Sequence, residues 1–263
     1  MEKVLDVLNA AYSWAMIRGE IEYNPVAPIK PTLVKRIQKM ERKSADDPDV
    51  IVLTAEEAKI FEQEALRINS KNGQRVYPAG IYGVLLLHTG MRCGEMLALR
   101  WRDIDLERGY LTIEKSRSMA KNRENDGKKY VAVEGSTKNS KARKIKLTEE
   151  AWNILKLLWN ESKAHAPDDL VVTTRTGRPN TATNLEHRMA IIFRNAGLTD
   201  MTGALHVFRR TFATRLYERG VRVKEIAAYI GDLESTTERY YIAVRKKVKD
   251  GEKIEQVVIL PPE

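Results

Sequence analysis

Apolar residues recur at helical spacing near the start of the chain, over residues 2–18. This pattern predicts one amphipathic helix, which ends near Gly19 and the prolines of "EYNPVAPIKP". A single helix cannot bury its apolar face alone. The helix therefore either docks on the rest of the chain or is the last piece of a domain whose other part lies elsewhere.

Helical patterns return further along the chain. In "LTAEEAKIFEQEAL", Thr54 and Glu57 have the spacing of a capping box, which predicts that a helix starts there. A buried helix is predicted over 79–88, and "MRCGEMLALRW" predicts a short helix after the break at Thr89 and Gly90. The remaining helices are predicted over residues 148–164, about 184–196, 206–219 and 222–230.

Three short segments between these helices are alternating or β-branched, at residues 110–116, 129–135 and 142–147. They suit a small antiparallel sheet. The polar "STKNSK" between the last two is predicted to be the turn of a hairpin. The predicted fold is mainly α with a small antiparallel β-sheet, an α+β fold.

Two segments lack a core pattern. Residues 31–50 are strongly charged and poor in large apolar side chains, which predicts a linker. Residues 246–263 run from a basic stretch to a short apolar segment, Val257–Leu260, and then prolines. An apolar tail needs a docking site, either within its own chain or on another subunit.

Composition narrows the functional class. The net charge of +9 and the pI of about 9.5 favour a polyanionic partner, most often nucleic acid. The sequence has no run of about 18 apolar residues, so no membrane-spanning helix is predicted. The N-terminus contains acidic residues and does not resemble a secretory signal. A single cysteine, Cys93, excludes an internal disulfide and fits a reducing cytoplasm. The cysteine and histidines do not have metal-ligand spacing.

Two pairs of residues are candidates for chemistry. His206 and Arg209 share one face of a predicted helix and could bind a phosphate together; the alternative is a solvated helix face. Arg92 and Glu95 are also three apart, so the carboxylate could fix the guanidinium; the alternative is a surface salt bridge worth about 0–1 kcal/mol. Lys138, at the predicted hairpin tip, could reach into a groove or simply add solubility.

The order Arg92, Lys138, His206-x-x-Arg209, Tyr240 resembles that of the tyrosine recombinases, the phage-integrase family. The segments "TGMRCGEMLALRWRDID" and "LHVFRRTFATRLYERGV" are similar to the two arginine boxes of the family. "STKNSKARKIKL" is similar to its lysine segment, and "STTERY" to its tyrosine box. The resemblance spans residues 50–245 and implies the catalytic-domain fold of that family.

The resemblance implies a site-specific recombinase for integration or excision of a phage or mobile element. The tyrosine would attack a DNA phosphate without a metal or other cofactor, leaving a 3′-phosphotyrosine and a free 5′-hydroxyl. Arg92 and Arg209 would stabilise the phosphate oxygens, and His206 would assist proton transfer. Lys138 would be the general acid, and Glu95 would support the Arg92 loop.

The resemblance also implies partners and an organisation into domains. The partners would be double-stranded DNA attachment sites. The protein would be a monomer when free and would form a synaptic tetramer on DNA. It would act in a bacterial cytoplasm, without a membrane partner. Residues 1–30 would be the last helix of a shortened core-binding domain, and 31–50 the interdomain linker. Residues 51–245 would form the catalytic domain, and 246–263 a tail that docks on a neighbouring subunit or in cis.

Two features depart from the family pattern. Asp232 stands where the family usually has His or Trp, and an ionised aspartate cannot donate a hydrogen bond to phosphate. It could be turned away from the site, or it could cap the next helix. The segment after Gly231 is also one residue short. Spacing from Arg209 then favours Tyr241 as the nucleophile, but the local box favours Tyr240. We favour Tyr240, because loops absorb a deletion more easily than a helix changes register.

Three other functions are compatible with parts of the sequence. A DNA-binding regulator would explain the resemblance of "VRVKEIAAYIGDLESTTERYY" to a helix-turn-helix. That hypothesis leaves Arg92, Lys138 and His206 without a role. A recombinase inactivated by the change at Asp232 or by N-terminal loss, and a type IB topoisomerase, are the remaining alternatives.

Overall fold

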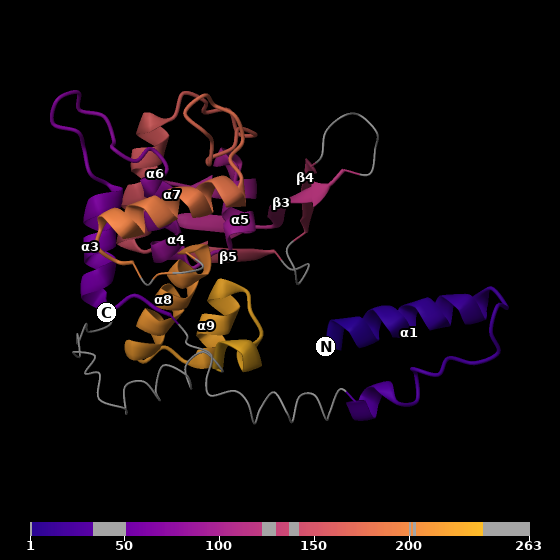
Figure 1. Cartoon of the computed structure of the whole chain (residues 1–263). Helices are drawn as coiled ribbons and strands as arrows, with labels where there is room; N and C mark the ends of the chain where they lie inside the picture. The colour runs from indigo at the N-terminus through magenta and orange to yellow at the C-terminus, as the bar shows by residue number, and fades with distance from the viewer. Residues whose placement is uncertain are drawn as a thin grey trace. The chain divides into compact units, whose positions relative to one another are not determined.

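A computed structural model describes residues 2–33, 51–122, 130–136, 142–199, 201 and 204–238. The chain divides into two compact units, Met1–Asp49 and Val50–Glu263 (Figure 1). Most of the predicted linker and all of the predicted tail lie outside the described residues. Among the residues that are described, no helix combines the length and the apolar character that a membrane crossing requires.

The first unit contains helix α1 (Glu2–Ile17), which confirms the predicted amphipathic helix, and the chain is helical again at residues 30–33. The chain turns back after α1, and the buried Asn24 amide donates a hydrogen bond of 2.9 Å to Ser13 Oγ. The side-chain oxygen of Asn24, Oδ1, accepts from the Val26 backbone N–H, which fixes the turn. Several large apolar side chains of α1 nevertheless remain exposed, with Ile17 at 84%.

The core of the second unit surrounds α4 (Gly80–Thr89), whose residues are almost all buried. A helix that is apolar on every side suits a central position. Around it pack α3 (Ala55–Ala65), α6 (Glu149–Glu161), α7 (Ala182–Asn195) and α8 (Ala204–Glu218) (Figure 1). Phe61, Phe193 and Phe208 meet in this core with ring centroids 4.8–5.5 Å apart. The predicted helices in these regions are confirmed.

The start of α3 follows the predicted capping box. The Thr54 side chain accepts from the Glu57 backbone N–H at 3.2 Å, and the Glu57 carboxylate accepts from the Thr54 N–H at 2.8 Å. The preceding Leu53 N–H donates to the Thr211 hydroxyl on α8. The residue just before the capping box therefore links the start of α3 to α8.

Within the described residues, the strands form two antiparallel sheets rather than the single predicted sheet. One sheet has the strand order β1 (Ile104–Asp105), β2 (Tyr110–Ile113) and β5 (Arg143–Lys146). The other sheet pairs β3 (Lys115–Lys121) with β4 (Tyr130–Ser136). The predicted hairpin around "STKNSK" is wrong, because β4 pairs with β3 whereas β5 pairs with β2. The segment that carries Lys138 therefore connects two sheets, and β3–β4 projects from this unit (Figure 1).

Among the described residues, the second unit also has a short helix that packs on β3 and another that packs on α8. Helix α5 (Cys93–Ala98) precedes a 3-10 turn, Trp101–Asp103, and α9 (Val223–Ile230) follows α8. A small second core, in which Phe212 of α8 meets Ile226 and Ile230 of α9, holds α8 and α9 together. After Gly231 and two further residues, the chain turns helical again at 234–238.

Candidate active site

Arg92 stands at the start of α5, where its backbone and its guanidinium both contact Glu95. The Arg92 backbone N–H donates to Glu95 Oε2, and Nη1 donates to Glu95 Oε1, each at 2.9 Å. Glu95 is 2% exposed. The predicted pair is therefore present, and the alternative of a surface salt bridge is wrong.

Gly90 sets the direction in which the chain enters this turn. It ends α4 in the left-handed region, with φ of 61°, and a Cβ atom there would lie 2.4 Å from the Phe212 ring. Only glycine avoids both the backbone strain and the collision. Its carbonyl oxygen is part of the site, because it accepts a hydrogen bond of 2.8 Å from Arg209.

Arg209 lies on α8 and is 7% exposed, so the alternative of a solvated helix face does not apply to it. Its Nη1 donates to the carbonyl oxygens of Gly90 and Ile230, both at 2.8 Å. These acceptors come from the ends of α4 and α9. The guanidinium thus bridges two helix ends, where a cation also interacts favourably with the helix dipole.

Arg143, on β5, is a site residue that the sequence reasoning missed. Its two Nη atoms donate to Glu95 Oε1 and Oε2 at 3.0 and 2.6 Å, and its Nε donates to the Tyr229 carbonyl oxygen at 3.0 Å. The sequence does carry a signal, because strand alternation places Arg143 on the same face as the buried Ile145. A basic residue on the inward face of a strand predicts a buried ion pair.

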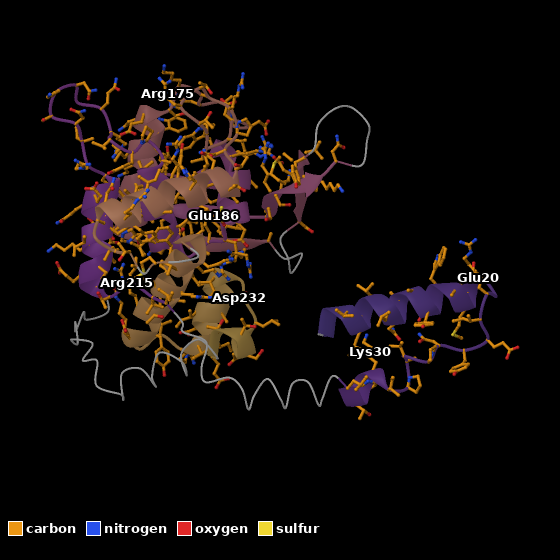
Figure 2. All side chains as sticks on the ribbon, viewed as in Figure 1. Glu20, Lys30, Arg175, Glu186, Arg215 and Asp232 are labelled. Carbon is orange, nitrogen blue, oxygen red and sulfur yellow. The ribbon has the colours of Figure 1, made fainter. Side chains whose placement is uncertain are left out.

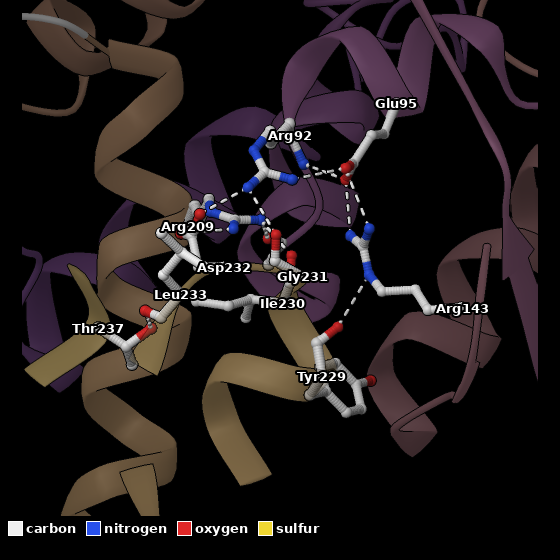
Figure 3. Close-up of polar contacts among 11 residues, drawn as sticks. Arg92, Glu95, Arg143, Arg209, Tyr229, Ile230, Gly231, Asp232, Leu233 and Thr237 are labelled. Carbon is white, nitrogen blue, oxygen red and sulfur yellow. Dashed lines mark hydrogen bonds and ion pairs between the residues drawn. The ribbon is translucent and has the colours of Figure 1, made fainter. Parts of the chain in front are cut away.

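Arg92, Arg143 and Arg209 all donate hydrogen bonds to the C-terminal end of α9. Successive carbonyl oxygens of Tyr229, Ile230 and Gly231 accept from Arg143, Arg209 and Arg92 in turn (Figure 3). Helix carbonyls at a C-terminus have no partner within the helix. The arginines satisfy them, and their guanidinium groups are thereby gathered around one short turn.

Asp232 completes the cluster. Its Oδ1 lies 2.5 Å from Arg92 Nη2, and its Oδ2 lies 2.7 Å from Arg209 Nη2. The expectation that it is turned away from the site is therefore wrong. Figure 2 shows Asp232 beside α8 and α9. Its described side-chain contacts are with the two arginines, so a capping role for the next helix stays a prediction.

The charges in the cluster determine its protonation. Desolvation raises the pKa of Asp232, but the charges and hydrogen bonds of Arg209 and Arg92 outweigh it and lower the pKa overall. For Glu95, the bonds and charges of Arg143 and Arg92 likewise outweigh desolvation and lower the pKa. Both carboxylates are therefore ionised at neutral pH.

His206 lies on α8 one turn before Arg209, with an exposed side chain. Desolvation of its ring lowers its pKa, and the charges of Arg210, Arg209 and Arg92 lower it further, whereas the charge of Glu186 raises it. The imidazole is therefore neutral at pH 7. It can donate one hydrogen bond and accept another.

Three candidate residues lie outside the described residues: Lys138, Tyr240 and Tyr241. The tyrosine at 229 is described, and it is poorly suited to be a nucleophile. Its hydroxyl donates to the Lys146 carbonyl oxygen, and burial raises its pKa to about 12. Within the described residues, no group of His, Cys, Asp or Glu could hold a metal ion.

A known protein family matches the chain over most of its length. The family model described as "Phage integrase family" matches residues 61–247. The chain belongs to the phage integrase family. The match covers the arginine cluster, His206 and both candidate tyrosines.

Individual integrases and recombinases are similar to this chain over different lengths. A "Tyrosine recombinase XerC-like" protein of Caldanaerobacter subterraneus is 32% identical over 181 residues, 63% of this chain and 46% of the relative. The integrase of Staphylococcus phage L54a is 25% identical over 229 residues, 83% of this chain and 62% of the relative. This chain thus spans between about half and two thirds of the length of these two relatives.

Solved structures of the family show the same fold. The Tn1549 transposon integrase, solved in complex with circular intermediate DNA, has a TM-score of 0.64 at 20% identity, covering 94% of this chain and 77% of the other. A lambda integrase dimer bound to a core site has a TM-score of 0.55 at 19% identity, covering 97% of this chain and 61% of the other. The predicted α+β fold of the phage integrase catalytic domain is confirmed.

Proposed function

We propose that this integrase-family chain is a site-specific DNA recombinase that cuts and rejoins strands through a 3′-phosphotyrosine. The observation that carries the proposal is the convergence of Arg92 and Arg209 on the two oxygens of one carboxylate. Two guanidinium groups so arranged have the geometry to bind two oxygens of a phosphate. The partner that we propose is a double-stranded attachment site, as the net charge of +9 also favours.

In the proposed reaction, the tyrosine oxygen forms a bond to the phosphorus of the scissile phosphate, and the bond to the 5′-oxygen breaks. Arg92 and Arg209 stabilise the negative charge on the non-bridging oxygens. Neutral His206 donates a hydrogen bond and assists proton transfer. Lys138 gives a proton to the leaving 5′-oxygen, and no metal is required. Nearby cations make a tyrosine with a usual pKa of about 10 easier to ionise.

We assign Tyr240 as the nucleophile, with Tyr241 as the alternative. Neighbouring residues on a helix point about 100° apart, so only one of the two can face the phosphate. Glu95 supports Arg92, since it accepts from both the backbone and the side chain of that residue. These roles complete the set that the resemblance implies.

The proposal is tested by trapping the covalent intermediate. The purified chain is incubated with a library of nicked duplexes of random sequence, in which the short leaving strand diffuses away. Protein–DNA adducts that survive SDS are isolated, and their DNA is sequenced. We expect an adduct, and a shared sequence in the trapped DNA would define the attachment site.

Two substitutions identify the nucleophile. Tyr240→Phe should abolish the adduct, whereas Tyr241→Phe should retain it; the reverse result would move the assignment to Tyr241. If the wild-type chain binds duplex DNA but gives no adduct from any sequence, the recombinase proposal fails for this chain, and a DNA-binding regulator or an inactivated recombinase replaces it.

The organisation around the catalytic domain is also part of the proposal. We infer that residues 1–30 form the last helix of a core-binding domain, and the exposed apolar side chains of α1 support this. We further infer that the chain acts in a bacterial cytoplasm as a monomer that forms a tetramer on DNA. Residues 246–263 would then dock on a neighbouring subunit. If deletion of residues 254–263 left tetramer formation on DNA unchanged, the docking role would be wrong.

A further inference from the structure

The Asp232 carboxylate occupies the position between the two arginines that an anionic ligand would take. Arg92 Nη2 and Arg209 Nη2 each reach a different oxygen of it, at 2.5 and 2.7 Å (Figure 3). A carboxylate and a phosphate present oxygens to guanidinium groups in similar ways. Asp232 thus makes the contacts that the proposed function assigns to the scissile phosphate.

The two arginines do not need Asp232 to hold them in place. Arg92 has two bonds to Glu95 and one to the Gly231 carbonyl oxygen. Arg209 has the carbonyl oxygens of Gly90 and Ile230. Without Asp232, the Arg92 guanidinium would keep Glu95 and the Gly231 carbonyl oxygen, and the Arg209 guanidinium would keep its two carbonyl oxygens. Their Nη2 donors would then be available to another anion.

Asp232 also changes the charge of the site. The three arginines of the cluster contribute three positive charges and its two carboxylates contribute two negative ones, which leaves one net positive charge. Neutralising Asp232 would raise this to two. The remaining carboxylate, Glu95, is 2% exposed and lies on the far side of Arg92 from Asp232 (Figure 3), so Asp232 is the one placed to oppose an incoming phosphate.

We propose that Asp232 is an internal occupant of the phosphate site, and that a DNA phosphate must displace its carboxylate before the strand is cut. This inference rests on the proposed function for the identity of the ligand. The occupied site would bind small anions poorly. A phosphate that the rest of the DNA interface delivers at high local concentration could compete.

The backbone around Asp232 allows this displacement by side-chain rotation alone. The Asp232 N–H donates to the Ala227 carbonyl oxygen at 2.9 Å, and the next residue, Leu233, accepts from the N–H groups of Thr236 and Thr237. These bonds hold the main chain on both sides of the carboxylate. The Asp232 side chain is 20% exposed, so it has access to solvent when it leaves the arginines.

The test uses inorganic phosphate as the probe, because its binding does not depend on DNA cleavage. Phosphate is titrated into the chain at pH 7 and constant ionic strength, and binding is followed by the 31P line width. Asp232→Asn should bind phosphate at least about tenfold more tightly than the wild type, since one opposing charge and its two hydrogen bonds are lost. Asp232→Glu, which keeps a carboxylate, should resemble the wild type.

A matched control is Asp168→Asn. Asp168 also pairs with an arginine, Arg102, but its side chain is 72% exposed and outside the cluster. It makes the same change in net charge and should leave phosphate affinity unchanged. The double variant Asp232→Asn, Arg92→Gln should lose the gain, which would place the bound phosphate at this site. Circular dichroism verifies that each variant is folded.

The outcomes separate this inference from the proposed function. Equal phosphate affinity in Asp232→Asn, Asp168→Asn and the wild type would overturn the occupant role, even if the wild type forms a DNA adduct. A gain in phosphate affinity without any DNA adduct would support the occupant role and reject the recombinase. If both Asp232→Asn and Asp232→Ala fail to fold, Asp232 holds the arginines together, and the inference is wrong.

The DNA assay gives a second, opposite pair of expectations. If Asp232 competes with the phosphate, Asp232→Asn should form the SDS-stable adduct about tenfold faster at subsaturating DNA. If Asp232 instead orients the arginines for the reaction, the adduct should form more slowly in Asp232→Asn than in the wild type, and the displacement model would be overturned.

Discussion

At the scale of single residues, Gly90 meets two requirements at once. It turns the chain out of α4 with φ of 61°, and it leaves room for the Phe212 ring. Its carbonyl oxygen also holds Arg209. A substitution here therefore combines backbone strain with displacement of a site residue.

Gly90→Ala should destabilise the chain by more than about 2 kcal/mol, because the left-handed conformation costs about 1–2 kcal/mol and the methyl group meets Phe212. Gly109→Ala is a matched control, since Gly109 has a similar φ of 68° but nothing within 4 Å of an added Cβ. Urea unfolding of both variants measures the difference. Equal destabilisation would show that the Phe212 contact costs nothing.

Arg143 illustrates how a residue can shape the site without a predicted role in the chemistry. It binds both oxygens of Glu95 and the α9 carbonyl of Tyr229. Since Glu95 in turn holds Arg92, we infer that Arg143 positions the arginine rather than contacting the substrate.

Arg143→Met should cost about 3–5 kcal/mol of unfolding free energy, because Glu95 would lose one of its two cationic partners while buried. Lys146→Met, on the same strand with an exposed side chain, should change stability by less than about 0.5 kcal/mol. Urea denaturation measures both. An Arg143→Met variant as stable as the wild type would show that Arg92 alone satisfies Glu95.

At the scale of elements, the helices were predictable because each carries local signals. The apolar run of α4 and the capping box of α3 depend on neighbours within one or two turns. The segments that form β2, β4 and β5 were also predicted, but β1, most of β3 and the pairing of the strands were not. Alternation fixes which side chains share a face and leaves open which strand lies alongside. The pairing of β4 with β3 rather than with β5 could therefore be established only from the structure.

The same limit applies to the candidate site. The sequence placed Arg92 near Glu95 and His206 near Arg209, since both pairs are three residues apart on a helix. It could not place Asp232 between two arginines, because these contacts join residues 140 and 23 apart on different elements. Arg143 was missed for a similar reason, as its partner Glu95 lies 48 residues away on another element.

At the scale of the whole molecule, the hydrophobic core belongs to the second unit. Every buried residue of the main core lies between Leu53 and Phe208. A fragment of residues 50–263 should therefore fold alone, with a thermal midpoint within about 4 °C of that of the full chain, which corresponds to roughly 1 kcal/mol. Differential scanning calorimetry of both forms measures this. A much lower midpoint for the fragment would mean that the first unit stabilises the second.

The two carboxylates of the arginine cluster make global stability depend on pH. The pKa values of Glu95 and Asp232 are lowered from 4.5 and 3.8 in the folded chain. Their contribution to stability is complete above those ordinary values and is lost as pH falls through the lower, folded values. Thermal unfolding between pH 7 and pH 3 should show a falling midpoint on the acid side.

Glu95→Gln should flatten that acid limb, because the amide cannot titrate. Its midpoint at pH 7 should be lower than that of the wild type, and the two curves should converge as the pH falls. An acid limb as steep in Glu95→Gln as in the wild type would assign the pH dependence to other carboxylates.

The turn that ends α9 also has a consequence for the order of folding. Its hydrogen bond to Arg92 closes a loop of 139 residues, and contacts this distant in sequence form after local helices have already assembled. Until α9 docks, the three arginines lie far apart along the chain and do not form a shared anion-binding site. A nascent or partly folded chain would therefore not hold polyanions through this cluster, which comes into existence only with the finished fold.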